Sequence, residues 1–261
     1  MGAGRLGEAL LSGMLRAGVA AEDAVVVVRR PERGAELVER YGVRVTSPAE
    51  AAQFADVLLV TVKPQDVEVA VNELAEADRL PLVITAVAGV PTAYFESRLP
   101  TGTAVVRVMT NTPVLVDEAM TVASAGAHAS AEDLDRTRSL FSAVGRFMVL
   151  PEKQQDAVTA LSGSGPAYFF YLVEAMTDAG ILLGLPRAVA AELLVQTALG
   201  AAVMLRDSGE HPVQLRESVT SPAGTTISAV RELEKHGVRA ALLAAIEAAR
   251  DRSQELGRAL A

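Results

Sequence analysis

Glycines at the beginning of the chain have a spacing that suits phosphate binding. Gly2, Gly4 and Gly7 form a GxGxxG pattern, which holds a dinucleotide pyrophosphate at a helix N-terminus when a buried strand leads into it. Only Met1 precedes the pattern here. Because that first strand is central in a sheet of this kind, we expect that it is missing from the sequence as given and that an apolar strand precedes Met1 in the native protein.

Two arginines, Arg29 and Arg30, follow an apolar run at residues 24–28, where a dinucleotide-binding unit has its second strand. An Asp or Glu at this place would accept hydrogen bonds from an unmodified ribose. Guanidinium groups match a 2′-phosphate instead, so the pattern favours NADP over NAD. The alternative is that both side chains are merely solvated.

Three further turns follow predicted strands, at residues 61–65 (TVKPQ), 86–89 (AVAG) and 108–113 (VMTNTP). Ligands of open α/β sheets bind at the carboxyl edge of the strands, so Lys63, Gly89 and Asn111 would line one crevice. Alternatively, Lys63 is a surface side chain, and Asn111 and Pro113 only shape a turn.

Two polar stretches interrupt the apolar second half of the chain, ALSGSGPAY at residues 160–168 and VTSPAGTT at residues 219–226. Each places hydroxyl groups and backbone N–H groups at a predicted helix start, where the helix dipole favours a carboxylate. The alternative is that Ser164 or Thr225 only caps its own helix.

The elements that must position these residues fall into two groups. Short apolar runs alternate with helical patterns over about the first hundred residues, and this alternation predicts a parallel, doubly wound sheet in a Rossmann-type domain of residues 1–150. Past Asn111 the pattern changes, and two later strands are expected around a helix. From residue 151 to 261 the strands stop, and the patterns at residues 166–184, 186–209 and 238–260 predict long helices. The first two are apolar on nearly every side, so we expect an all-helical domain that forms an obligate dimer. The expected fold class is α/β with this second domain.

Composition excludes several classes of function. The net charge of −8 gives no basic footprint for nucleic acid. The chain has no Cys, and His128, His211 and His236 lie far apart, so we expect no metal site. We find no signal peptide and no apolar run long enough to span a bilayer, which predicts a soluble cytoplasmic protein without a membrane partner.

Taken together and in this order, GAGRLGEALLSG, VKPQ, MTNTP, ALSGSGPAY and VTSPAGTT resemble the Δ1-pyrroline-5-carboxylate reductase family over the whole chain. The resemblance implies an oxidoreductase that binds NADPH, with NADH possible, and that reduces 1-pyrroline-5-carboxylate to L-proline in proline biosynthesis. It also implies a helical domain that interlocks two subunits, with possible assembly into decamers.

The resemblance also assigns roles to residues. Backbone amides of the loop Ser221–Thr226 would hold the substrate carboxylate with the help of Ser164, and the Thr226 hydroxyl would reach the ring nitrogen. The family usually has glycine at Ala223 and proline at Thr110. The expected cofactor-binding residues are Gly2, Gly4, Arg5, Leu6, Gly7, Arg29, Arg30, Val62, Lys63, Pro64, Ala88, Gly89 and Asn111. Of these, residues 4–7 would hold the pyrophosphate.

Two other functions remain open at this point. A related imine or β-hydroxyacid reductase could use the same fold. A hydroxyacid dehydrogenase needs a Lys or His general acid in the helical domain, where the sequence offers only Lys153, Lys235, His211 and His236, none of them in a motif. The chain could also be a non-catalytic nucleotide-binding or dimerisation module.

Overall fold

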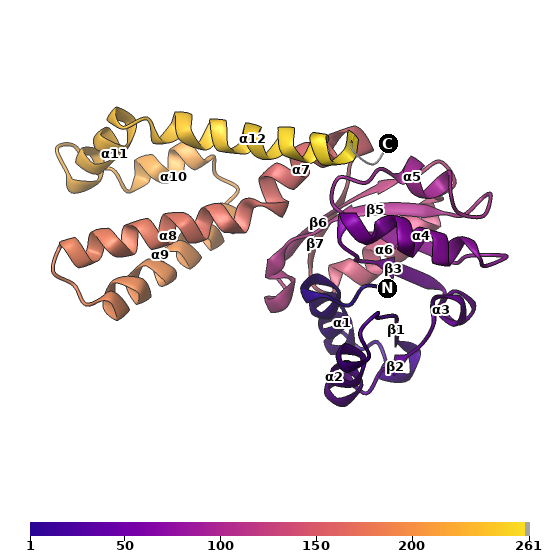
Figure 1. Ribbon diagram of the computed structural model, residues 1–261. Helices are drawn as coiled ribbons and strands as arrows, with labels where there is room; N and C mark the ends of the chain where they lie inside the picture. Colours follow the sequence, from indigo (N-terminus) through magenta and orange to yellow (C-terminus); the bar gives the residue numbers. More distant parts are fainter. Residues whose placement is uncertain (259–261) are drawn as a thin grey trace. The chain divides into compact units, whose positions relative to one another are not determined.

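The computed structural model describes residues 1–258. The chain divides into two compact units (Figure 1). The first holds Met1–Pro166 together with the part of α12 (Val238–Arg258) from Ala248 on, and we call it the sheet unit. The second, Ala167–Glu247, is the helical unit.

This division differs from the expected boundary after residue 150. Side chains beyond that boundary are bonded into the sheet unit. Glu152 accepts hydrogen bonds from the backbone N–H of Thr92 at 2.7 Å and from its hydroxyl at 2.8 Å, and it forms an ion pair with the buried Arg107. The Ser253 hydroxyl donates to Asp156 at 2.7 Å. These bonds join residues 152–156 and the end of α12 to the sheet.

The alternation of helices and strands predicted from the sequence is present throughout the sheet unit. Its helices are α1 (Arg5–Arg16), α2 (Pro31–Tyr41), α3 (Pro48–Phe54), α4 (Val67–Ala75), α5 (Thr92–Glu96) and α6 (Ala131–Ser142). Its strands are β1 (Val25–Val26), β2 (Arg44–Val45), β3 (Val57–Val60), β4 (Leu82–Thr85), β5 (Val105–Met109), β6 (Ala119–Ala125) and β7 (Gly145–Val149).

The strands form a five-stranded sheet, in the order β3-β4-β5-β6-β7, and a separate parallel pair, β1-β2. This arrangement confirms a Rossmann-type fold. Strand β6 runs antiparallel to β5, while the other pairs are parallel. The connection between β5 and β6 is too short for a crossover, which needs a dozen or more residues.

Alternate residues of the strands are buried on opposite faces of the sheet. Val60 and Val83 pack with Phe95 in a cluster that includes residues of α3, α4 and α5. Ile84 packs instead with Leu10 of α1 and with α6. Since successive side chains in a strand point to opposite faces, unbroken apolar runs are what a sheet covered on both faces requires.

Met1 and Gly2 lie between β1 and β3. The Met1 amino group donates to the carbonyl of Leu59 at 2.7 Å, and the Gly2 N–H donates to the carbonyl of Val27 at 3.0 Å. Burial lowers the pKa of this amino group to about 6. A cavity of about 630 Å³ adjoins these residues, and its lining includes Val25 and Leu59. Met1 and Gly2 therefore bridge the facing edges of β1 and β3.

The second half of the chain is helical, as the sequence predicts. The helices are α7 (Gln155–Val158), α8 (Gly165–Leu182), α9 (Arg187–Asp207), α10 (Pro212–Ser218), α11 (Thr225–Lys235) and α12, with one π-helical turn at Thr159–Gly163. Gly180 of α8 meets Ala190 of α9 so closely that a Cβ on Gly180 would lie 2.7 Å from the Cβ of Ala190. Close contact of this kind lets two helices pack as a pair.

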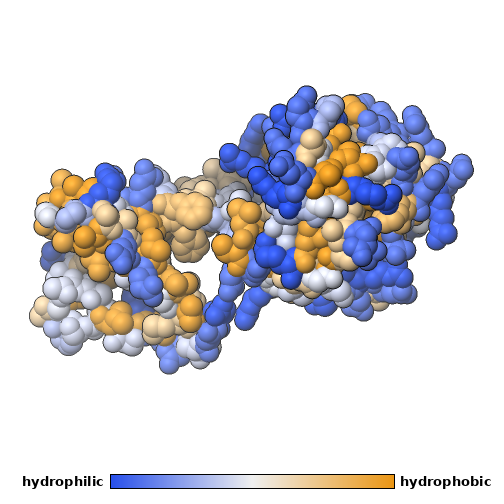
Figure 2. Space-filling model, turned by 90° about the horizontal axis from the view of Figure 1, so that it is seen from below, coloured by the Kyte–Doolittle hydropathy of each residue, from blue (hydrophilic) through white to orange (hydrophobic). Residues whose placement is uncertain are grey.

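Large apolar side chains are exposed on the helical unit (Figure 2). Phe169, Phe170 and Tyr171 of α8 are each about 70% exposed, and Leu182 is 89% exposed. Leu193, Val195 and Leu199 of α9 are more than half exposed. Patches of this kind mark interaction surfaces in soluble proteins.

Helix α9 corrects one expectation. Its 21 residues have a mean hydropathy of 1.8 in the most apolar window, so by length and composition it could cross a membrane. The expectation of no apolar run long enough to span a bilayer is therefore wrong for α9, whose apolar run includes one acidic residue, Glu192. A helix buried between subunits has the same composition, so this property alone is weak evidence for a membrane.

Candidate active site

The glycine turn has the geometry of a phosphate cradle. Gly2 has φ +86°, and a Cβ there would lie 2.7 Å from Val62 Cγ1. A Cβ on Gly7 would lie 2.6 Å from the Thr61 hydroxyl oxygen. Gly4 faces open space and begins α1 without a side-chain cap. Two glycines thus close the turn against β3, and the third leaves room for a ligand at the helix N-terminus. These residues fit a dinucleotide pyrophosphate.

Arg29 and Arg30 differ in their contacts. Arg29 forms a two-pronged ion pair with Asp66, with Nη1 2.9 Å from Oδ1 and Nη2 2.8 Å from Oδ2. Within residues 1–258, Arg30 forms no ion pair, and it lies exposed at the N-terminus of α2. Each is on the surface, where an anionic ligand could reach it.

Arg33, which the sequence analysis missed, ties the glycine turn to α2. Its Nε donates to the carbonyl of Ala3 at 3.1 Å, and its guanidinium group pairs with Glu8 and Glu36. The hydrogen bond from Arg33 is the main cause of a lowered pKa at Glu8, which Tyr41 also supports. The sequence signal for this contact was a basic residue, Arg33, in the second helix and an acidic residue, Glu8, directly after the glycine pattern.

The predicted turns at 61–65, 86–89 and 108–113 follow β3, β4 and β5, which are neighbouring parallel strands. Lys63, Gly89 and Asn111 therefore lie at the same edge of the sheet. The Thr61 hydroxyl donates to the carbonyl of Gly2 at 2.8 Å, which fixes the residues before Val62, Lys63 and Pro64 against the glycine turn.

Asn111 and the 86–89 turn also serve the fold. The Asn111 carboxamide donates to the carbonyl of Ser162 at 3.0 Å and accepts from the N–H of Met120 at 3.0 Å. Gly89 has φ +76°, and a Cβ there would lie 3.2 Å from Leu256 Cβ. The contacts of the Asn111 side chain and the positive φ of Gly89 thus stabilise the fold itself. A cofactor at these turns would contact the neighbouring backbone, including that of Ala88.

The loop Ser221–Thr226 is a tight turn followed by α11. The Gly224 N–H donates to the carbonyl of Ser221 at 3.1 Å, and Ala223 has φ +57°. A proline at the second position and a positive φ at the third match a type II turn. The helix begins with Gly224 as N-cap and without a side-chain cap. The alternative that Thr225 caps its own helix is therefore wrong, and the first N–H groups of α11 are available to an anion.

The hydroxyl of Thr226 lies in the first turn of α11. Among the described residues, the side chain of Thr226 has no hydrogen-bond partner and is half-buried. Ser164 lies between the π-helical turn and α8, where its N–H donates to the carbonyl of Thr159 at 2.8 Å. Since this N–H continues the helical bonding from residue 159, Ser164 does not begin a separate helix as its N-cap.

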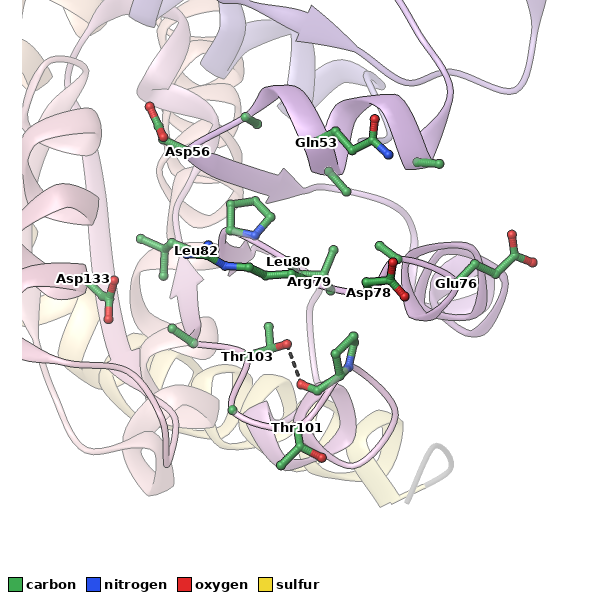
Figure 3. Close-up of a pocket in the computed structure, with 18 of the residues that line it drawn as sticks. Gln53, Asp56, Glu76, Asp78, Arg79, Leu80, Leu82, Thr101, Thr103 and Asp133 are labelled. Atoms are coloured by element: carbon green, nitrogen blue, oxygen red, sulfur yellow. Dashed lines mark hydrogen bonds between the residues drawn. The ribbon is translucent and has the colours of Figure 1, made fainter.

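A further pocket of about 860 Å³ opens beside Leu82 and Ala104, at the amino ends of β4 and β5 (Figure 3). The hydrogen bond from Thr103 to the carbonyl of Pro100, at 2.6 Å, lies on its wall. Since the predicted site residues follow the carboxyl ends of these strands, this pocket is at the wrong edge of the sheet for them. Within residues 1–258 no group of three or more His, Cys, Asp or Glu side chains gathers as a metal site would require.

Comparison with known proteins decides the family. The chain is 45% identical to pyrroline-5-carboxylate reductase of Mycobacterium tuberculosis over a 280-residue alignment that covers 98% of this chain and 95% of the relative. The chain belongs to the pyrroline-5-carboxylate reductase family. The family model for pyrroline-5-carboxylate reductase dimerisation matches residues 152–256. A second model, NADP oxidoreductase coenzyme F420-dependent, matches residues 1–89.

Solved structures of pyrroline-5-carboxylate reductases have the same fold. The enzyme from Plasmodium falciparum with NADP bound superposes with a TM-score of 0.90 at 28% identity, covering 98% of this chain and 96% of that one. The enzyme from Coxiella burnetii gives a TM-score of 0.89 at 34% identity over 98% and 96% of the two chains.

Two departures from the pyrroline-5-carboxylate reductase pattern now have a structural setting. Thr110, at the usual proline, is buried, and its hydroxyl accepts a hydrogen bond from Thr121 at 2.8 Å. Ala223, at the usual glycine, has a left-handed conformation that glycine adopts without steric cost. The first departure is compensated by a hydrogen bond, whereas the second leaves backbone strain.

Proposed function

We propose that this chain reduces 1-pyrroline-5-carboxylate to L-proline with NADPH, using the glycine turn for the cofactor and the Ser221–Thr226 loop for the substrate. The observation that carries the proposal is the start of α11, which has no side-chain cap, beside the Thr226 hydroxyl, which has no hydrogen-bond partner within residues 1–258. A carboxylate is stabilised by the free N–H groups of a helix N-terminus, and an acceptor hydroxyl nearby suits a protonated imine.

On the cofactor side, Gly4, Arg5, Leu6 and Gly7 would bind the pyrophosphate with their backbone N–H groups. Arg29 and Arg30 would bind the 2′-phosphate, as guanidinium groups bind phosphates through charge-assisted hydrogen bonds. The turns at residues 62–64, 88–89 and 111 would line the nicotinamide side. When bound, NADPH supplies the hydride.

On the substrate side, the reaction needs little general acid–base catalysis from the chain. The backbone of residues 224–226 would bind the carboxylate and the Thr226 hydroxyl would accept a hydrogen bond from the ring N–H, with Ser164 as a further polar contact. A protonated cyclic imine is already electrophilic, so positioning it is the main catalytic task.

Three of the four side chains that a hydroxyacid dehydrogenase could use as a general acid have contacts of their own, and the fourth, Lys153, is exposed. His211 accepts a hydrogen bond from the N–H of Val213 at 3.3 Å and so caps α10. His236 Nδ1 lies 3.1 Å from the carbonyl of Glu232, and Lys235 pairs with the Glu232 carboxylate at 3.4 Å. These contacts favour imine reduction over the hydroxyacid alternative.

The proposed assembly is a cytoplasmic homodimer formed through the helical unit, with a decamer as a possible higher assembly. The exposed apolar residues of α8 and α9 support it, because a second copy would remove them from water. The acidic charge of the chain is consistent with a small-molecule substrate and with no nucleic-acid or membrane partner.

The test is NADPH oxidation by the purified protein, followed at 340 nm (the absorbance of the reduced nicotinamide). We expect NADPH oxidation that depends on pyrroline-5-carboxylate and yields proline, and no reduction of NADP⁺ when a β-hydroxy acid is supplied instead. NADPH binding without turnover would instead indicate a non-catalytic nucleotide-binding module and overturn the proposal.

A further inference from the structure

The ion pair between Arg29 and Asp66 joins two parts of the predicted cofactor edge. Arg29 follows β1, and Asp66 ends the short 3-10 helix η2 (Pro64–Asp66) that follows the VKP turn. Both oxygens of the carboxylate contact the guanidinium group, at 2.9 Å and 2.8 Å. The ion pair thus places the Asp66 carboxylate beside Arg29, at the predicted 2′-phosphate position, where the sequence analysis identified only the two arginines.

We propose that Asp66 is a specificity-determining residue that lowers the preference of this enzyme for NADPH over NADH. The inference rests on the proposed binding of the 2′-phosphate by Arg29. An Asp66 carboxylate competes with that phosphate for the same guanidinium group of Arg29. Beside an unmodified ribose, the same carboxylate is an acceptor for the 2′-hydroxyl, which is the usual role of an acidic residue in NAD-binding units.

The burial of the two side chains shows which partner is fixed. The Asp66 side chain is 24% exposed and that of Arg29 is 69% exposed. Asp66 is also held by its own backbone, since its N–H donates to the carbonyl of Lys63 at 2.9 Å and it stands at the N-cap of α4. Arg29 is therefore the partner that moves when a phosphate arrives, and Asp66 remains beside the site.

The neighbouring arginines define a clear comparison. Arg33 is engaged by Glu8 and Glu36, while Arg30 has no ion pair within residues 1–258. In the wild-type protein the unpaired Arg30 should therefore contribute more to phosphate binding than the neutralised Arg29. Removing the Asp66 charge should raise the contribution of Arg29 and leave that of Arg30 unchanged.

The experiment measures binding of 2′,5′-ADP and of 5′-ADP by calorimetry in the full-length protein, for wild type, Asp66→Asn, Arg29→Ser and the double variant. These probes carry the adenosine end of the two cofactors without the nicotinamide. An exposed ion pair contributes little, so we expect Asp66→Asn to tighten 2′,5′-ADP binding about two- to five-fold. Binding of 5′-ADP should not tighten, and the effect should vanish on the Arg29→Ser background. The kcat/KM ratio of NADPH to NADH should rise in parallel.

Glu68→Gln is the matched control, since it removes one exposed carboxylate two residues along the same chain segment. Equal tightening by Glu68→Gln, or tightening that persists with Arg29→Ser, would overturn the inference, because the effect would then be one of general charge. Weaker or unchanged 2′,5′-ADP binding in Asp66→Asn would overturn it as well. If Arg29→Ser together with Arg30→Ser leaves 2′,5′-ADP binding unchanged, the arginine assignment in the proposed function fails instead.

Discussion

Replacing Ala223 with glycine should stabilise the protein. Ala223 has φ +57°, and the left-handed conformation costs a residue with a Cβ about 1–2 kcal/mol. Glycine avoids this cost but loses more backbone entropy on folding, by about 0.5–1 kcal/mol. The difference between these two ranges predicts a net gain of about 0–1.5 kcal/mol in the free energy of unfolding, with a midpoint of about 0.75 kcal/mol. Ala223 is exposed, so the substitution leaves no cavity that would offset the gain.

The assay is urea denaturation at one fixed protein concentration, because a dimer's stability depends on concentration. Ala229→Gly is the control: Ala229 is exposed in the interior of α11, where glycine should destabilise by about 0.5–1 kcal/mol. The two substitutions are chemically identical and should have opposite signs. If Ala223→Gly destabilises as much as Ala229→Gly, the backbone at Ala223 is not strained and the reasoning is refuted.

Three other predictions concern the sheet unit. Replacing Arg29 and Arg30 together by Ser should raise the KM for NADPH far more than that for NADH, and an unchanged ratio of kcat/KM for the two cofactors would remove the arginines from the site. Hydrogen bonds from the Thr46 hydroxyl and from Ser47 lower the pKa of Glu50 from its ordinary value of 4.5 to about 2. These bonds stabilise the folded protein above pH 4.5, and the stabilisation is lost as the pH falls toward 2. Glu50→Gln should therefore reduce the decline of the urea midpoint between pH 4.5 and pH 2. A short Val/Ile-rich segment joined before Met1 should fill the cavity between β1 and β3, where each buried side chain contributes about 1.5–3 kcal/mol. The Tm and the NADPH affinity should therefore be higher than with a Gly/Ser segment of equal length. Equal Tm and equal affinity for the two segments would show that no strand fits there.

The sheet could be predicted because buried parallel strands have unbroken apolar sequences, as at Val57–Val60 and Leu82–Thr85. No direction was predicted for β6, although the short connection after Met109 contained that information. The α/β class and the helical second half were predicted because apolar periodicity is local in the sequence.

Side-chain pairs between distant segments could not be predicted. Arg29 and Asp66 are 37 positions apart, and no pattern in the sequence specifies that they meet. Arg33 was missed for the same reason, since its bonds to Ala3 and Glu8 depend on how α1 and α2 pack. At residues 221–224, the resemblance indicated only that glycine is usual at Ala223, and the positive φ there became known from the structure.

The most direct test of the central claim, that the 221–226 loop binds the imine, is the kcat/KM for pyrroline-5-carboxylate of Thr226→Val, with Thr225→Val as control. Valine keeps the shape of threonine and removes the hydroxyl. A lost hydrogen bond to a charged nitrogen costs about 1.5–3 kcal/mol, so we predict a fall of about one to two orders of magnitude for Thr226→Val. NADPH affinity should be unchanged, and Thr225→Val should retain most of the activity. Full activity of Thr226→Val would contradict the account.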